Sequence, residues 1–254
     1  MTPAPLAGLR VLVTRPAHQA AGLVLKLEDR GAVVQALPLL AIAPPQDAAA
    51  ARAVLQAGRG ADLWIFTSAN AVQGAQALQG EGWPPQLLAI GQATARALAA
   101  QGHAALAPEG GSSEDLLLWP ELAELHGKRV VLVTGEGGRS LLARTLADRG
   151  ASVSVACCYR REVIAQQPGV LLSALRAADV ALLTSGEALQ ALLLQLPSAE
   201  VVQQLPLLLP SRRVAEAARA AGCTGPLLLP AAMSDAALCT RLEQWRAAPH
   251  NDCP

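Results

Sequence analysis

The sequence predicts an α/β protein with parallel β-sheets, and two observations lead to this class. Short apolar runs alternate with segments of helical periodicity along almost all of the 254 residues. In addition, VLVT, a leucine and DRGA occur in the same order in residues 11–34 and again in residues 131–153. Alternation of strands and helices favours parallel pairing with right-handed crossovers, and the repeat favours a duplicated architecture.

Each expected strand is short and apolar, and the expected helices follow turns of small polar residues. Strands are expected at residues 9–14, 32–42, 62–68, 87–90, 180–185, 207–209 and 227–229, and at both ends of the 129–161 segment. Helices are expected at 17–30, 47–56, from about 70, 95–101, 116–125, 168–178, between 211 and 222, and from 234 to 245. Gly31 and Gly222 end two of the helices. Ser113 caps the helix at 116–125, and Pro120 kinks or splits it.

The repeat extends beyond the DRGA segments. The pair Thr67-Ser68 recurs as Thr184-Ser185, and residues 87–102 correspond to residues 207–222. The chain therefore has the order A, B, A′, B′, where A carries DRGA and B carries the Thr-Ser pair. The residues alone leave open whether A pairs with B or with B′ in a sheet.

Composition excludes several functional classes. The formal net charge is zero and 52% of the residues are hydrophobic, which argues against a nucleic-acid partner and against disorder. The N-terminus has no signal pattern, and no apolar run approaches the roughly 18 residues of a membrane span. We therefore expect a cytoplasmic protein. An odd number of cysteines without CxxC spacing indicates buried, reduced thiols, at Cys157, Cys158, Cys223, Cys239 and Cys253.

Small polar residues follow nearly all of the expected strands, mostly where a helix begins. Because ligands of such sheets bind beyond the carboxyl ends of the strands, these turns are expected to share one functional edge suited to anions. Taken singly, each turn would serve only to cap its helix. The turns are Thr14-Arg15, Thr67-Ser68, 91–94, 135–139, Thr184-Ser185 and 211–213.

Familiar catalytic motifs do not occur in the sequence. Residues 135–138 (GEGG) resemble a dinucleotide fingerprint only loosely, and the chain has no GxxxxGK followed by Ser or Thr. The sequence also lacks HExxH, a Cys/His cluster and GxSxG. Neither a nucleotide site, nor a metal site, nor a hydrolase triad is therefore expected.

Tyr159, the only tyrosine, is the most distinctive single residue. It ends an apolar strand and precedes Arg160, Arg161 and Glu162, at the transition from apolar to polar surroundings. A phenol in this position can donate a proton to a leaving hydroxyl. It can equally be an amphipathic aromatic residue with a satisfied hydroxyl at a domain junction.

Taken together, VLVTRP, FTSANAV, IGQATARAL, VTGEGGRSLLARTLADRGASV followed by a tyrosine, LLTSGEAL and PSRRVAEAARAAG resemble the uroporphyrinogen-III synthase family over nearly the whole chain. The resemblance implies two flavodoxin-like domains with an active site in the cleft between them. Domain 1 would comprise residues 1–38 and 163–254, and domain 2 residues 39–162, with extended linkers at about 35–42 and 156–164. Unit A would thus pair with B′, and B with A′.

The resemblance also implies a reaction. Hydroxymethylbilane, a linear tetrapyrrole with eight carboxylates, would lose its terminal hydroxyl to give an azafulvene cation. Attack on the substituted carbon of ring D gives a spiro intermediate, and ring D is then released, inverted and rejoined as uroporphyrinogen III. This cyclising lyase needs no cofactor, and a transient contact with the enzyme that supplies its unstable substrate would fit. A monomer is expected, and the alternative is a non-enzymatic two-lobed anion-binding protein.

Site residues follow from matching the family's motifs position by position. Tyr159 corresponds to the tyrosine that assists departure of the hydroxyl. Asn70 departs from the pattern because some relatives carry Arg there, and residues 210–213 replace a glycine-containing turn. The residues expected to bind substrate are Arg15, Thr67, Ser68, Asn70, Gly91, Thr94, Gly138, Arg139, Ser185, Gly186, Ser211 and Arg212.

The substitution Tyr159→Phe tests the catalytic expectation. Removing the phenol hydroxyl is expected to slow turnover about ten-fold or more, because one proton donor is lost, while the fold stays intact. Steady-state turnover and circular dichroism would measure the two effects. Full activity in this variant would exclude Tyr159 from the mechanism without contradicting the family resemblance.

Overall fold

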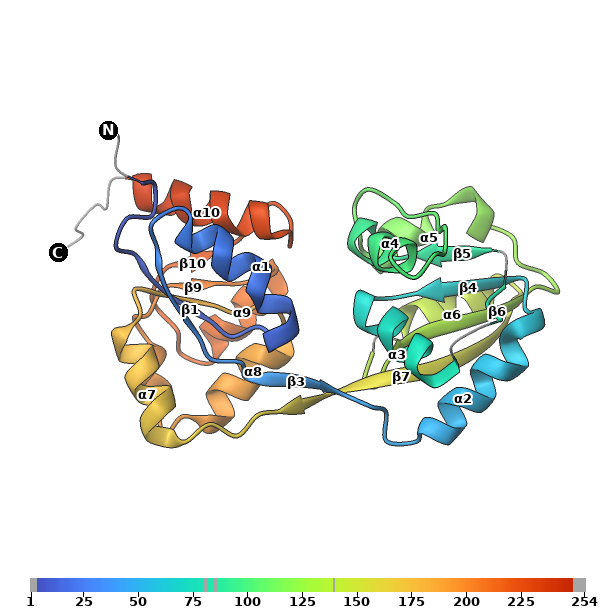
Figure 1. Cartoon of the computed structure of the whole chain (residues 1–254), viewed down its shortest axis with the longest axis horizontal. Coiled ribbons are helices and arrows are strands. Elements are labelled where there is room, and N and C mark those ends of the chain that lie inside the picture. The colour runs from blue at the N-terminus through green and yellow to red at the C-terminus, as the bar shows by residue number, and fades with distance from the viewer. Residues whose placement is uncertain (1–3, 80–81, 85, 139, 249–254) are drawn as a thin grey trace. The chain divides into compact units, whose positions relative to one another are not determined.

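The computed structural model describes residues 4–79, 82–84, 86–138 and 140–248, and the chain divides into two compact units. Unit 1 consists of Met1–Ala41 and Glu162–Pro254, and unit 2 of Ile42–Arg161. The chain passes from one unit to the other twice, within strands β3 (Leu40–Ala43) and β7 (Ser152–Val163) (Figure 1). Unit 2 is therefore an insertion into unit 1.

Unit 1 contains a parallel sheet with helices on both faces (Figure 1). Its spatial order, β2-β1-β8-β9-β10, is that of a flavodoxin-like sheet. The strands are β1 (Arg10–Val13), β2 (Val33–Ala36), β8 (Val180–Leu182), β9 (Leu207–Leu208) and β10 (Leu227–Leu228). One face packs against α1 (Ala17–Glu28) and α10 (Asp235–Ala247), and the other against α7 (Pro168–Ala177), α8 (Gly186–Gln195) and α9 (Arg212–Ala220).

In unit 2 the strand order is β3-β7-β6-β4-β5, in which β7-β6-β4-β5 repeats β2-β1-β8-β9 of unit 1 and β3 is added beside β7. β4 (Leu63–Phe66), β5 (Leu87–Ala89), β6 (Arg129–Gly135) and β7 pair in parallel. One face carries α2 (Ala48–Ala57), α3 (Ala69–Gln79) and α4 (Gln92–Ala99), and the other α5 (Ser113–Leu117) and α6 (Leu141–Asp148). Among the described residues, the 3₁₀ helices η1 (Gly58–Gly60) and η3 (Ala199–Val202) were not predicted, whereas η2 (Pro120–Leu122) lies within the segment 116–125 that was expected to be a kinked or split helix.

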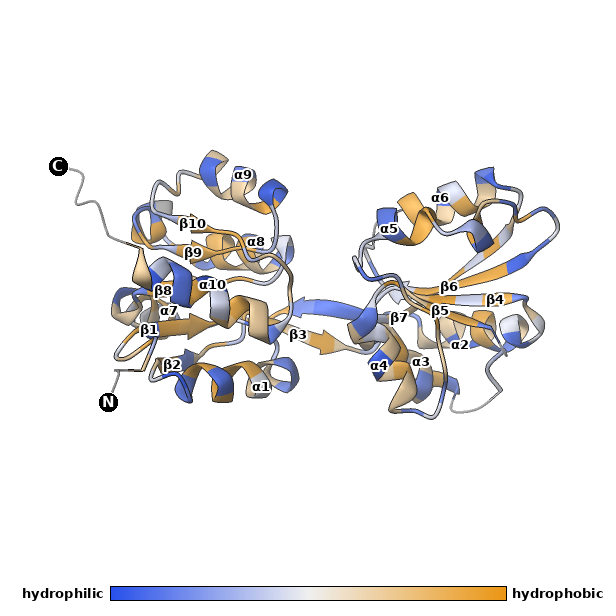
Figure 2. Cartoon of the chain, turned by 90° about the horizontal axis from the view of Figure 1, so that it is seen from above, coloured by the Kyte–Doolittle hydropathy of each residue, from blue (hydrophilic) through white to orange (hydrophobic). Residues whose placement is uncertain are grey.

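Every central strand supplies side chains to two hydrophobic cores, one on each face of its sheet. In β4, Trp64 and Phe66 pack beneath α2 and α3, whereas Leu63 and Ile65 pack against α5 and α6. All four are almost fully buried, which explains why these strands read as continuous apolar runs (Figure 2). Burial of each such side chain contributes about 1.5–3 kcal/mol.

The structure confirms the predicted α/β class and the exchange of partners between repeats. β1 of segment A pairs with β8 of segment B′, and β4 of segment B pairs with β6 of segment A′. Corresponding turns also share their backbone geometry: Gly31 and Gly150 have φ values of 87° and 91°, and Gly102 and Gly222 of 82° and 93°. Only glycine adopts this left-handed region without strain, so the duplicated glycines end the duplicated helices.

Some details differ from the expectations. The extended segment at 32–42 forms two strands, β2 and β3, which lie in different sheets. The N-cap of α5 is Ser112 and not Ser113, because Asp115 three residues later closes a capping box: Ser112 Oγ accepts from Asp115 N, and Asp115 Oδ2 from Ser112 N, both at 3.0 Å. Pro120 does split the following segment, since it starts η2.

The cysteines are free thiols wherever the structure describes them. Cys158, Cys223 and Cys239 are buried as expected. The prediction was wrong for Cys157, which is half-buried because the strand alternation turns its side chain away from that of Cys158. Cys253 lies outside the described residues. No described helix has the length and apolar character of a membrane span, and the described residues contain no group of three potential metal ligands.

Gly74 in α3 provides a test of helix–sheet packing. A Cβ atom at this position would lie 2.3 Å from the carbonyl oxygen of Cys158 in β7. We therefore expect Gly74→Ala to lower the free energy of unfolding by about 1–3 kcal/mol. The matched control is Gly169→Ala in α7, where a Cβ meets no atom within 4 Å. Urea denaturation compares the variants, and equal stability of the two would contradict this packing.

Candidate active site

The polar turns predicted from the sequence lie at the carboxyl ends of parallel strands in each unit. In unit 2 the strand order reverses between β6 and β4, where ligands of such sheets bind. Thr67 follows β4, and its hydroxyl lies 2.9 Å from that of Thr134 in β6. The backbone N–H of Thr67 donates to the Val133 carbonyl (3.1 Å). The two strand ends are thus tied together at this edge.

Tyr159 lies at the same edge, although its strand, β7, is on the far side of β6. Its side chain is only 4% exposed. The phenol Oη lies 3.2 Å from Ser68 Oγ and accepts a hydrogen bond from Arg161 Nη2 (3.1 Å). The guanidinium carbon of Arg161 is 5.3 Å from the centre of the ring, close enough for a cation–π contact.

A β-bulge orients this tyrosine. Thr134 is opposite Cys157 in the ladder, but Gly135 is opposite Tyr159, so β7 contains one additional residue at this point. Because a bulge breaks the alternation of side chains, the adjacent residues Cys158 and Tyr159 are both buried. The ring then lies directly over Gly135, where a Cβ would come within 2.5 Å of its Cζ atom. The glycine at this position therefore makes room for the tyrosine.

The remaining predicted residues of unit 2 surround the starts of α3 and α4. Ser68 caps α3, since its Oγ accepts from Ala71 N (3.1 Å), and Asn70 is buried in the first turn. Gly91 is the N-cap of α4, and a Cβ there would meet Gly111 Cα at 2.6 Å. Thr94 is buried in the first turn of α4. These residues shape two adjacent helix starts.

The glycine-rich turn after β6 is held from two sides. Glu136 N donates to the Tyr159 carbonyl (2.8 Å), and Glu136 Oε1 accepts from Gln46 N (2.6 Å). Gly138 is exposed and closes the turn through its N–H to the Gly135 carbonyl (3.4 Å). Arg139, predicted to bind substrate, lies outside the described residues.

Unit 1 has an equivalent edge with helix caps at corresponding positions. Ser185 Oγ accepts from Ala188 N (3.1 Å) at the start of α8, and Gly186 is the first residue of that helix. Ser211 Oγ accepts from Val214 N (3.5 Å) at the start of α9, and the adjacent Arg212 is exposed. Ser185 thus repeats the capping geometry of Ser68.

Arg15 has a protein partner at this edge. Its Nη1 lies 2.7 Å from Asp235 Oδ1, in an ion pair whose side chains are 16% and 25% exposed. Lys26 Nζ approaches the second oxygen of Asp235 at 3.6 Å. The ion pair connects the β1–α1 turn to the start of α10, so Arg15 has a structural task in addition to any contact with a ligand.

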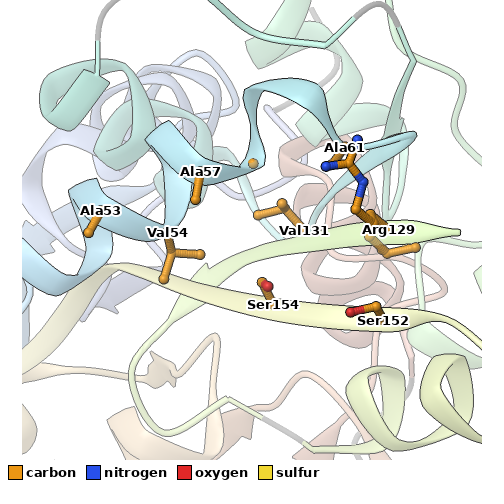
Figure 3. Close-up of a pocket in the computed structure, with 10 residues that line it drawn as sticks. Ala53, Val54, Ala57, Ala61, Arg129, Val131, Ser152 and Ser154 are labelled. Carbon is orange, nitrogen blue, oxygen red and sulfur yellow. The ribbon is translucent and has the colours of Figure 1, made fainter.

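Sequence reasoning missed some features of this region. It did not anticipate the contact of Arg161 with Tyr159, although the alternation of side chains along β7 favours it. It also missed a hollow of about 360 Å³ between α2 and strands β6 and β7 (Figure 3). Arg129 and Ser152, at the amino ends of their strands, line this hollow. It therefore lies at the opposite edge of the sheet from Tyr159.

The two thiols beside Tyr159 are poor nucleophiles. Burial raises the pKa of Cys158 to about 12, and burial together with the Glu136 carboxylate raises the pKa of Cys157. Because the thiolate is the reactive form, both side chains stay protonated near neutral pH. The groups at this edge able to act chemically are therefore hydroxyls, backbone N–H groups, guanidinium groups and the Glu136 carboxylate.

Comparison with known proteins agrees with this architecture. Residues 21–228 match the family model described as Uroporphyrinogen-III synthase HemD. The chain is 36% identical over 198 residues to the uroporphyrinogen-III synthase of Escherichia coli (strain K12), covering 74% of this chain and 80% of that protein. Identity to the uroporphyrinogen-III synthase of Synechococcus elongatus is 33% over 193 residues, covering 72% of each chain.

Solved structures show the same fold. A mutant uroporphyrinogen III synthase from the extremely thermophilic bacterium Thermus thermophilus superposes with a TM-score of 0.61 at 23% identity, covering 94% of this chain and 98% of that chain. The uroporphyrinogen-III synthetase of Helicobacter pylori 26695 gives a TM-score of 0.59 at 17% identity, with 93% and 99% covered. Since the family model spans more than half of the sequence, the chain belongs to the uroporphyrinogen-III synthase family.

Proposed function

We propose that this chain cyclises hydroxymethylbilane to uroporphyrinogen III with loss of water, and that its polar strand-end turns bind the carboxylates of the substrate. The observation that carries the proposal is the placement of Tyr159: a buried phenol lies beside a capped helix start at the switch point of a parallel sheet. Family membership supports the reaction and disfavours a non-enzymatic anion-binding protein.

Helix starts supply the proposed carboxylate sites. α3, α4, α8 and α9 each begin at a carboxyl edge with Ser or Gly as N-cap. Backbone N–H groups of a first turn have no partner within the helix, and the helix dipole favours an anion there by about 0.3–1 kcal/mol. Each contact is weak, so a substrate with many carboxylates is held by several at once. This supports a polycarboxylate as ligand.

Tyr159 is the proposed proton donor. Its phenol proton passes to the terminal hydroxyl of hydroxymethylbilane, and the carbon–oxygen bond breaks with its electron pair going to oxygen, which leaves as water. The cation that remains is delocalised over the adjacent pyrrole. When the macrocycle closes, a ring carbon loses a proton, and this proton restores the phenol. The sequence of steps is balanced without an oxidant or a reductant, so the chemistry itself calls for no redox cofactor.

Inversion of ring D is mainly a problem of geometry. In water the activated chain closes head to tail, so the protein must hold it where attack on the substituted carbon is faster. Restricting a flexible reactant in this way can lower the activation free energy by about 7–11 kcal/mol in well-oriented cases. The monomeric state, the cytoplasmic setting and a contact with the enzyme that supplies the substrate stay predictions.

Product analysis tests the proposed reaction. Freshly generated hydroxymethylbilane is incubated with the purified chain and, separately, in buffer alone, and the oxidised products are separated into type I and type III isomers. We expect predominantly type III with the protein and type I in buffer. Type I alone in both samples would contradict the proposed function.

Ser185 and Ser234 offer a matched pair that separates substrate binding from helix capping. Both serines cap helices of unit 1, accepting from Ala188 N (3.1 Å) and Ala237 N (3.2 Å) respectively. Replacing either by alanine is expected to cost about 1 kcal/mol of stability. Only Ser185→Ala is expected to raise KM, by about five-fold, because it also loses a hydrogen bond to a carboxylate. Equal KM values in both variants would exclude Ser185 as a substrate contact.

A further inference from the structure

We propose that Arg161 is a positioning residue for Tyr159: together with Ser68 it fills the acceptor positions of the phenol oxygen, so that the phenol proton is directed to the substrate. The inference rests on the proposed role of Tyr159 as proton donor. It assigns a task to Arg161, which lies next to the predicted site residues without having been counted among them.

The contact with Arg161 fixes the direction of one hydrogen bond. A guanidinium group has five N–H donors and no acceptor, so at 3.1 Å the Tyr159 oxygen must accept from Nη2. The same guanidinium lies 5.3 Å from the ring centre, within the range of a cation–π contact. Arg161 therefore touches both the oxygen and the ring of Tyr159.

The contact with Ser68 completes the arrangement. Ser68 Oγ accepts from Ala71 N as the cap of α3 (3.1 Å), which leaves its own proton available. Tyr159 Oη lies 3.2 Å away in a position to accept that proton. A phenol oxygen that accepts from both Ser68 and Arg161 has no acceptor capacity left over, and its own O–H must find a partner elsewhere.

This arrangement suits a proton donor in two ways. Before the reaction, the phenol proton is not consumed by a bond to the protein and can point to the leaving hydroxyl. After transfer, both donors remain in place and stabilise the phenolate, with Arg161 supplying a positive charge. Arg161 is exposed, so solvent screens this charge and its effect on rate is moderate.

The neighbouring Arg160 has a different hydrogen-bond partner from Arg161. Arg160 Nη1 donates to the carbonyl of Pro44 (3.0 Å). Successive residues of a strand point to opposite faces, so Arg161 lies on the side of Tyr159 and Arg160 on the other. Arg160 is therefore a suitable control for the loss of one positive charge at this end of β7.

Raman spectroscopy can test the hydrogen bonds directly, because Tyr159 is the only tyrosine in the chain. The intensity ratio of the tyrosine Fermi doublet is high when the phenol oxygen accepts strong hydrogen bonds and low when the hydroxyl donates one. We expect the ratio to be lower in Arg161→Met than in the unmodified protein, because one donor to the phenol oxygen is lost, and to be unchanged in Arg160→Met. A low intensity ratio in the unmodified protein would overturn the proposal, and so would an intensity ratio in Arg161→Met equal to that of the unmodified protein.

A double-mutant cycle tests the same idea kinetically. Arg161→Met is expected to lower kcat about five-fold with KM unchanged, and Arg161→Lys to retain part of the rate. In the Tyr159→Phe background, Arg161→Met is expected to change kcat less than about two-fold, because its target is already gone. Losses that multiply in the double variant would show that Arg161 acts independently, and would overturn the inference while leaving Tyr159 as proton donor.

The two proposals fail in different ways. If the unmodified protein makes type III product and Tyr159→Phe makes it at the same rate, the proton-donor role of Tyr159 and the positioning role of Arg161 are both rejected. The proposed reaction then still stands. If the unmodified chain makes only type I product, the proposed function itself is rejected. The Raman ratio is informative in either case, because it does not depend on activity.

Discussion

Parallel pairing brings the carboxyl ends of β1 and β8 to the same edge of one sheet. In the other sheet it does the same for the carboxyl ends of β4 and β6. Every helix that follows such a strand then begins at that edge, with its unpaired N–H groups turned outward. Folding thus creates donors for anions without a single lysine being required. The hydrophobic cores on both faces of each sheet fix the positions of these helix starts, so the stability of the sheets and the geometry of the site have one origin.

Much of this organisation could be predicted because it depends on contacts that are short in sequence. The caps formed by Ser68, Ser185 and Ser211 each involve a backbone N–H three residues later, and a local pattern is sufficient to anticipate them. The same holds for the glycines that end the duplicated helices. Which repeat pairs with which could not be decided from the residues alone, because A and A′ carry the same motif, and so do B and B′.

The features that could not be predicted from the sequence depend on strand register and on contacts between residues far apart in the chain. Without the bulge at Gly135, the alternation along β7 would turn Tyr159 away from Cys158 and from the face that carries α3. No local sequence pattern predicts the single additional residue of a β-bulge. The ion pair of Arg15 with Asp235 joins residues 220 positions apart, so an arginine that looked available for substrate turned out to have a carboxylate partner already.

The chemistry of the substrate gives a reason for building the site from many weak donors. Substrate and product differ by one molecule of water and carry the same carboxylates, so tight carboxylate binding would retain the product as firmly as the substrate. Uniform binding does not accelerate the chemical step. The carboxylate sites proposed at several helix starts, each contributing little, would hold the linear tetrapyrrole in a folded form and still release the product. The group that must discriminate is the one that acts only during loss of the hydroxyl, and in this protein the buried phenol of Tyr159 is suited to that role.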